Sequence, residues 1–400
     1  MLTFADALAR LLGSISPLGA GRVPLDEAAG RVLAEDLAAP APMPAFDYSA
    51  MDGYALRSND HLGAGPLQIS VVGESAAGRP LPELAPGSAC RIFTGARLPA
   101  GADAVVMQEH AERVGDTITI SAAPRVGAHV RRRGADLEQG AIALRSGMRL
   151  TPGKIALAAA LDRPQLLVAR RPVVTVLCSG DELRSPGEPA IPGSVTESNG
   201  YFVAAQARVA GAIVRVAPFV RDDADVARAA VTDALRGADV VVTIGGVSVG
   251  DHDVIRPALE AAGVTLDFWR VKIKPGKPLA VGRAGPAHVI GLPGNPASAS
   301  LTFLLFGVPL LRALQGDAAP LPARLVARVA GAIRREPGRE EFRRARLEQG
   351  PQGLVARLLP NQDSGSVVSF AEAEALVVLP ADREAIDDGD ALEVIRLADV

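Results

Sequence analysis

The sequence predicts a multi-domain α/β protein that combines a helical platform, a β-rich insert, a parallel α/β/α domain and a small all-β domain. Its 400 residues are too many for a single hydrophobic core. Residues 171–316 alternate β-branched apolar runs with helical patterns, which is typical of a parallel sheet. Residues 61–137 and 321–400 consist of short apolar runs broken by turn residues, and the latter segment fits either a barrel or a sandwich.

Composition excludes several classes of protein. Apolar residues make up 48% of the chain and charged residues 22%, which is ordinary for a folded protein, and the net charge of −3 gives no basic surplus for binding nucleic acid. We expect a soluble, cytoplasmic protein, because the sequence has no secretory signal and no apolar run of about 18 residues. Cys90 and Cys178 fit a reducing compartment, and the five histidines show no zinc-ligand spacing.

The helical patterns near the N-terminus set the domain boundaries. Phe4–Leu12 has helical spacing, a second helix is expected to start at Pro24 and continue through Ala28–Leu33, and a third covers 148–164. We therefore expect a helical platform made of residues 1–38 and 138–170. The expected remaining domains are a β-rich insert at 39–137, an α/β domain at 171–318 and a C-terminal β domain at 319–400.

Three loops of the α/β domain are rich in Gly, Pro and short polar residues. They are GGVSVGDHD (245–253), KIKPGKP (272–278) and GLPGNP (291–296), and they follow or adjoin apolar runs at Val240–Ile244, Phe268–Ile273 and Val289–Ile290. Each loop alone could simply turn the chain. Because the carboxyl ends of parallel strands gather at one edge of a sheet, we expect the three loops to form one pocket.

The loop residues predict a site for a phosphate or another oxyanion. Gly245 and Gly246 let backbone N–H groups approach an anion, and Lys274 and Lys277 flank a stiff Pro-Gly turn. Asp251 and Asp253 add carboxylates, which beside a phosphate site predict Mg²⁺. Asn295 and Pro296 stand at a helix start, where negative charge is favoured. Neither a Walker P-loop nor the G-x-G-x-x-G fingerprint is present.

Other candidate positions have a simple structural alternative. Glu182 follows a strand that ends near Cys178, so it can reach the same edge, whereas we expect Cys178 to be a packing residue. Asp52 fits a turn as well as a site. Asp136 follows Arg131–Arg133, and this cluster favours a surface ion pair over the wall of an anion site.

Seven motifs carry a family resemblance. SAMDGYA, RIFTGARLP, RRRGAD, CSGDEL, TIGGVSVGDHD, FWRVKIKPGKP and GLPGNP occur in this order. Together they resemble the molybdopterin molybdenumtransferase family, which includes bacterial MoeA and the E domain of gephyrin, and the resemblance covers essentially the whole chain.

The resemblance implies a fold and a reaction. It implies a helical platform, a β-rich insert, a molybdopterin-binding α/β domain and a C-terminal β-barrel. It also implies a homodimer whose site lies between one subunit's α/β domain and the partner's insert. Adenylylated molybdopterin and molybdate would be the substrates, AMP would be released, and Mg²⁺ would be the cofactor. Contacts with the adenylylating enzyme and with molybdoenzymes are further implied partners.

The resemblance also assigns residues. Asp52, Thr94 and Asp136 would act from the insert, and Glu182 and Asp253 would hold Mg²⁺ and the pyrophosphate. Further catalytic positions would be Asp222, Arg270 and Lys274, with Arg270 standing where family members often carry lysine. By the resemblance Pro293 and Pro296 would shape the floor of the substrate pocket. The chemistry of the loops adds the other expected substrate contacts, which are Gly245, Gly246, Ser248, Lys277 and Asn295.

Three alternatives remain open at this point. The chain could be a molybdopterin adenylyltransferase-like enzyme, although its regions outside the α/β domain argue against this. It could be a non-catalytic scaffold of the same fold, although its set of acidic residues argues against this. Nothing in the sequence separates molybdate from tungstate as the substrate.

Overall fold

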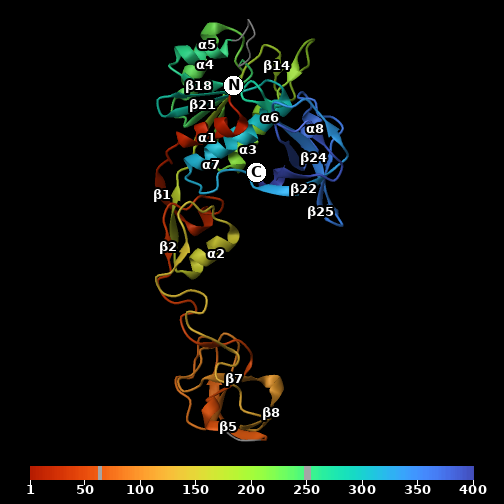
Figure 1. The fold of residues 1–400 in the computed structure, drawn as a ribbon. Helices are drawn as coiled ribbons and strands as arrows, with labels where there is room; N and C mark the ends of the chain where they lie inside the picture. Colours follow the sequence, from red (N-terminus) through yellow and green to blue (C-terminus); the bar gives the residue numbers. More distant parts are fainter. Residues whose placement is uncertain (62–64, 247–253) are drawn as a thin grey trace. The chain divides into compact units, whose positions relative to one another are not determined.

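The computed structural model covers residues 1–400 and describes all of them except 62–64 and 247–253. The chain forms two compact units (Figure 1). The first contains residues 1–35, 146–151 and 165–400, and the second contains residues 36–145 and 152–164. The four-domain boundaries expected from the sequence remain predictions.

A six-stranded sheet organises the first unit. Its strand order is β16-β13-β17-β21-β20-β18. The strands are β13 (Val173–Cys178), β16 (Ile213–Val216), β17 (Val240–Ile244), β18 (Thr265–Trp269), β20 (Ala280–Ala284) and β21 (Ala287–Leu292). β16, β13, β17 and β21 are parallel, and β20 is antiparallel to both β21 and β18. Consequently β18 runs in the same direction as the parallel strands, and its carboxyl end lies at the same edge of the sheet.

Helices cover both faces of this sheet, because successive strand residues point to opposite sides. Val240 and Val242 belong to one core with α1 (Phe4–Gly13), α3 (Asn199–Val209), α6 (Pro296–Thr302) and α7 (Val308–Leu314). Val241 belongs to a second core with α4 (Ala224–Leu235) and α5 (Ile255–Ala261). The expected α/β/α arrangement is therefore confirmed.

The strongly apolar segment Pro296–Leu314 is a core helix of this domain. It consists of α6, a π-helical turn at Phe303–Gly307, and α7. By length and composition it could cross a membrane, but 89% of its apolar window is buried inside the protein. Phe306 contacts Phe4 of α1 edge to face, with ring centroids 5.4 Å apart. The apolar surface of this helix must be buried against other residues, and most of it is buried within the same chain.

The C-terminal region forms a closed five-stranded barrel, which resolves the choice between barrel and sandwich. Strands pair in the order β24-β25-β22-β28-β26, and β26 pairs with β24 to close the ring. They are β22 (Arg324–Ala330), β24 (Glu340–Gly350), β25 (Gly353–Leu358), β26 (Ala375–Leu379) and β28 (Ala391–Arg396). A two-residue strand from the α/β domain, β19 (Ile273–Lys274), adds in parallel beside β24.

The expected platform is less helical than its pattern indicates. α1 is present, but the helix expected through Ala28–Leu33 is wrong, since the structure has only a 3₁₀ turn at Leu25–Glu27. Gly30 has φ of 74°, which ends helical geometry, and Leu33 then forms a bridge with Val168. β1 (Ala20–Pro24) likewise pairs with β12 (Gln165–Ala169). Long-range strand pairing has overridden the local helical pattern here.

The second unit contains the β-rich insert. Its six-stranded sheet has the order β7-β4-β6-β5-β9-β8. The strands are β4 (Gly53–Leu56), β5 (Leu67–Ser75), β6 (Ser88–Ile92), β7 (Ala104–Met107), β8 (Ala111–Val114) and β9 (Thr117–Ile120). α2 (Pro152–Ala160) also belongs to this unit and begins at proline, as the sequence predicts. Asp52 directly precedes β4, and Thr94 follows β6 closely.

Gly53 is a position where the fold of this sheet demands glycine. A Cβ at Gly53 would overlap the backbone carbonyl of Val106 on the neighbouring strand β7. We expect Gly53→Ala to lower the free energy of unfolding by about 2 kcal/mol or more, measured by urea denaturation. Gly153→Ala in α2, where a Cβ would meet no atom within 4 Å, should be neutral or slightly stabilising. Equal effects of the two substitutions would contradict the argument.

Candidate functional site

Backbone hydrogen bonds join the loops after β13, β17 and β21 at the carboxyl edge of the sheet. The Ser179 N–H donates to the Ile244 carbonyl at 3.1 Å, and the Gly245 N–H donates to the Leu292 carbonyl at 3.2 Å. Gly245 and Gly246 have φ of 82° and 62°, a region that favours glycine. A Cβ on Gly245 would lie 2.9 Å from the Ser179 carbonyl oxygen. The first and third predicted loops therefore lie side by side, as far as the described residues show.

An acidic group lies at the same edge, beyond β13 and β16. The Asp222 N–H donates to Asp181 Oδ1 at 3.2 Å, and the Gly180 N–H donates to the Val220 carbonyl at 3.0 Å. The carboxylate of Glu182 folds back over Gly180, where any Cβ would collide with it. Asp222 lies outside α4, because Asp223 caps that helix by accepting from Asp225 N and Val226 N. Asp222 therefore has no helix-capping role, and its carboxylate can take part in a site at this edge of the sheet.

These carboxylates do not complete a magnesium site by themselves. Among the residues that the structure describes, no group of three or more His, Cys, Asp or Glu side chains is placed to hold a metal ion. Asp253, the second predicted magnesium ligand, lies in the undescribed segment 247–253, as do Asp251 and the predicted substrate contact Ser248. We therefore assign no chemical step to the metal.

Lys274 leaves the sheet edge and joins the barrel. The sequence suggests one strand through Phe268–Ile273, but β18 ends at Trp269 and β19 begins at Ile273. β19 then pairs with β24, with Lys274 opposite Glu341. The chain then turns back towards β20: the Lys277 carbonyl accepts from Val271 N at 3.1 Å, and Arg270 N donates to the Leu279 carbonyl at 3.0 Å.

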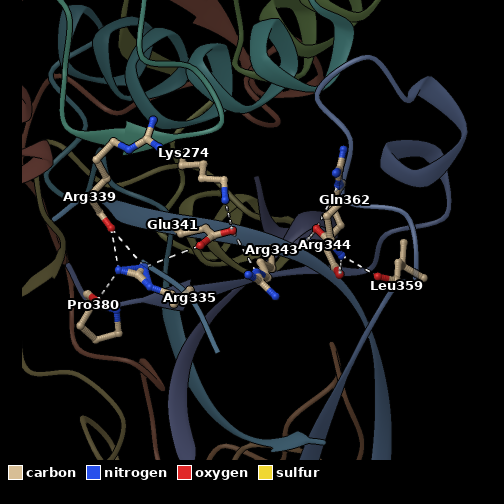
Figure 2. A network of polar contacts seen from close by, with 9 residues as sticks. All are labelled: Lys274, Arg335, Arg339, Glu341, Arg343, Arg344, Leu359, Gln362 and Pro380. Atoms are coloured by element: carbon tan, nitrogen blue, oxygen red, sulfur yellow. Dashed lines mark hydrogen bonds and ion pairs between the residues drawn. The ribbon is translucent and has the colours of Figure 1, made fainter. Parts of the chain in front are cut away.

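Glu341 is surrounded by cationic side chains from both the α/β domain and the barrel. Its side chain is 7% exposed and lies 3.4 Å from Lys274 Nζ, 2.9 Å from Arg343 Nε and 3.7 Å from Arg335 Nη1 (Figure 2). Three cationic groups thus surround one buried carboxylate, which leaves a local surplus of positive charge. An open groove of about 640 Å³ lies beside Lys274 and Arg343.

A loop of the barrel domain connects this groove to the sheet edge. Asn361, Gln362 and Asp363 line the groove. The next residue, Ser364, accepts a hydrogen bond from Asn295 Nδ2 at 3.0 Å, and its carbonyl accepts from Ala297 N at 2.8 Å. Predicted contact residues of the GLPGNP loop are therefore anchored to the segment that forms the groove. Pro293 in this loop is buried, and Pro296 begins α6.

In the second unit, Asp52 and Thr94 form a close pair. Asp52 Oδ1 accepts from both the backbone N–H and the hydroxyl of Thr94, each at 2.8 Å. These two hydrogen bonds lower the pKa of the Asp52 carboxyl below its usual value. Asp136 is instead paired with Arg131 at 2.6 Å, with both side chains about half exposed. That contact matches the surface ion pair that the sequence favours.

The cysteines agree with a packing role. Burial raises the pKa of Cys90 to about 11. Burial, followed by the neighbouring carboxylate of Glu197, also raises the pKa of Cys178. A neutral buried thiol is a poor nucleophile.

Comparisons with known proteins agree with this architecture. Residues 2–161 match the model of the MoeA N-terminal region, residues 175–313 a probable molybdopterin-binding domain, and residues 326–397 the MoeA C-terminal region. A molybdopterin molybdenumtransferase of Haemophilus influenzae is 36% identical over 98% of each chain. One from Synechococcus elongatus is 36% identical over 99% of this chain and 100% of its own. The chain belongs to the MoeA family.

A solved MoeA-family structure shares the whole fold. The crystal structure of a molybdopterin biosynthesis MoeA protein from Pyrococcus horikoshii is similar with a TM-score of 0.87 and 29% identity. The match covers 99% of this chain and 100% of that one. The barrel of this MoeA-family chain is therefore part of the shared architecture.

Sequence reasoning missed the contribution of the barrel to the site. The C-terminal region shows no obvious chemical cluster along the sequence, yet Glu341 contacts Lys274, Ser364 contacts Asn295, and Arg343 lines the same groove as Lys274. The run EEFRRARL in an alternating strand was the available signal, since Arg344 is 2% exposed in the structure. A buried arginine needs partners, and Arg344 finds Gln362 and the carbonyl of Asp363.

Thr94 should control the ionisation of Asp52. Thr94→Val removes the hydroxyl donor but keeps the backbone N–H, so we expect the pKa of Asp52 to rise towards its ordinary value. Carboxyl-carbon NMR titration measures this pKa, and Thr94→Ser should leave it low. Because the folded pKa is depressed, the stabilisation by this pair exists above the unfolded pKa and is lost as pH falls through the folded pKa. An unchanged titration in Thr94→Val would contradict this interpretation.

Glu341 should matter for stability more than an exposed glutamate. Glu341→Gln leaves Arg335, whose side chain is 2% exposed, without its anionic partner. We expect a loss of about 2 kcal/mol or more in the free energy of unfolding. Glu348→Gln, which weakens an exposed pair with Arg357 on the same barrel, serves as the control and should be nearly silent. Comparable losses in the two variants would refute the role given to Glu341.

Proposed function

We propose that this chain inserts molybdate into adenylylated molybdopterin with release of AMP, as an enzyme of molybdenum cofactor biosynthesis. The near full-length likeness to curated molybdopterin molybdenumtransferases supports the reaction class. The structural observation that carries the proposal is that Lys274 and Arg343 line one open groove. Ser364, which follows the groove residues in the chain, hydrogen-bonds Asn295 at the sheet edge.

The two substrates need two separate anion sites. Adenylylated molybdopterin carries a pyrophosphate, and we assign it to the backbone at Gly246, since the Gly245 N–H is already bonded to the Leu292 carbonyl. Molybdate is a tetrahedral dianion, and we assign it to the groove, where Lys274 and Arg343 can donate hydrogen bonds to its oxygens. Release of AMP breaks a P–O bond of the pyrophosphate, and water supplies the oxygen that replaces it. Glu182 and Asp222 lie at the edge where this water would need orientation.

Several features of the proposal rest on the family resemblance. Magnesium would be held by Glu182 together with Asp253 and would neutralise pyrophosphate charge when bound. A homodimer would bring Asp52, Thr94 and Asp136 of a partner subunit to this site. We also propose a cytoplasmic location, with the adenylylating enzyme and molybdoenzymes as partners. An adenylyltransferase role would leave the MoeA N-terminal and C-terminal regions without a function.

An assay of molybdate-dependent AMP release tests the proposal. Purified chain with adenylylated molybdopterin, molybdate and magnesium should release AMP, and absence of release would reject the function.

The two groove cations should act on molybdate binding. In Lys274→Gln and Arg343→Gln, we expect the KM for molybdate to rise by about tenfold or more, because each removes one charged hydrogen-bond donor. The KM for the adenylylated substrate should change little. Arg357→Gln, on the same barrel but paired with Glu348, is the matched control. An equal effect on both substrates would place the oxyanion elsewhere.

A further inference from the structure

A second cavity of the first unit lies near the sheet edge, away from the basic groove. It has a volume of about 520 Å³, within the range of small-molecule sites. Its walls come from α3, from the end of β16 and the segment after it, and from Ser185 and Glu197, which directly follow the paired strands β14 (Leu183–Arg184) and β15 (Val195–Thr196). β14 directly follows Glu182, and Asn199 at the start of α3 donates to the Gly294 carbonyl at 2.7 Å. The cavity thus adjoins the loops assigned to the substrate.

A buried carboxylate, that of Glu197, lines this cavity. Glu197 is 6% exposed, and its Oε1 accepts from the Gly200 N–H at 2.6 Å. The carboxylate also hydrogen-bonds the thiol of Cys178. A Cβ on Gly200 would lie 2.7 Å from Cys178 Sγ and 3.1 Å from Glu197 Oε2, so glycine there permits this close arrangement. Because a carboxylate has about four acceptor positions, about two remain for a ligand.

The remaining walls can pack against the two faces of a flat ring. Tyr201, Val216, Pro218 and Phe219 supply aromatic and aliphatic surface, and Arg208 adds N–H donors. Ligand sites typically combine such surface with a few polar groups that fix orientation. A fixed carboxylate selects a heterocycle with two adjacent N–H donors on one edge.

We infer that this cavity binds the pterin ring of the substrate, with Glu197 accepting from the 2-amino group and from N3–H. The inference rests on the proposed function, since that function makes a pterin the substrate. Glu197 is thus a specificity-determining residue, separate from the groups that handle phosphate and molybdate.

A pair of ligands that differ at one position tests the inference. 6-Hydroxymethylpterin carries the 2-amino group, whereas 6-hydroxymethyllumazine carries a 2-oxo group that would face the carboxylate. In fluorescence titrations of the full chain, we expect the pterin to bind about tenfold more tightly or better. Glu197→Gln presents one acceptor and one donor, which match the 2-oxo and N3–H of the lumazine. This variant should therefore lose or reverse the preference.

Two further variants separate recognition from folding. Glu197→Asp keeps the charge and should keep the preference for the pterin at reduced affinity. Glu188→Gln removes a carboxylate from the same segment, outside the cavity lining, and should behave as wild type. A role of Glu197 limited to holding Gly200 would leave ligand preference unchanged in Glu197→Gln, and that result would overturn the inference. Equal binding of the two ligands by the wild type would overturn it as well.

The outcome can be distinguished from failure of the proposed function. The titrations need neither nucleotide nor molybdate, whereas AMP release tests the reaction itself. AMP release without discrimination between the ligands would reject the pterin site alone. Discrimination without AMP release would reject the transferase reaction and leave the pterin site standing.

Discussion

The short parallel pairing of β19 with β24 is the interaction on which the proposed site depends. It draws the chain after β18 out of the α/β sheet and places Lys274 opposite Glu341 of the barrel. A backbone hydrogen bond from Glu340 N to the Lys272 carbonyl, at 3.0 Å, extends the same junction. Without this pairing, nothing would hold the KIKPGKP loop (272–278) beside the arginines of β24.

Burial of Glu341 determines how charge is distributed at that junction. A buried carboxylate requires cations, and Lys274, Arg335 and Arg343 supply them from two domains. Arg335 is itself buried and also donates to the carbonyls of Arg339 and Pro380, so it is committed to structure (Figure 2). Lys274 and Arg343 face the groove instead. The same carboxylate therefore stabilises the junction and orients two cations for an anion.

At the carboxyl edge of the sheet, the backbone rather than charged side chains shapes the site. Gly245 and Gly246 adopt conformations that side chains disfavour, and their neighbours approach too closely for a Cβ. Acidic side chains stand beyond β13 and β16, next to this backbone. Glu197 lies slightly deeper, beside Cys178 at the end of β13. Backbone donors, exposed carboxylates and one buried carboxylate are thus available to different parts of one substrate.

The sequence by itself determined most of the order of strands and helices, the first and third loops at the carboxyl edge and the family, because hydrophobic periodicity and turn residues are local signals. It was wrong for Ala28–Leu33, where pairing with distant strands outweighs helical spacing. Only the tertiary structure decided that Lys274 meets Glu341, that Arg343 lines a groove and that Glu197 lines a cavity. These contacts join residues far apart in the chain. They depend on burial and charge pairing between distant segments, which a local sequence pattern does not reveal.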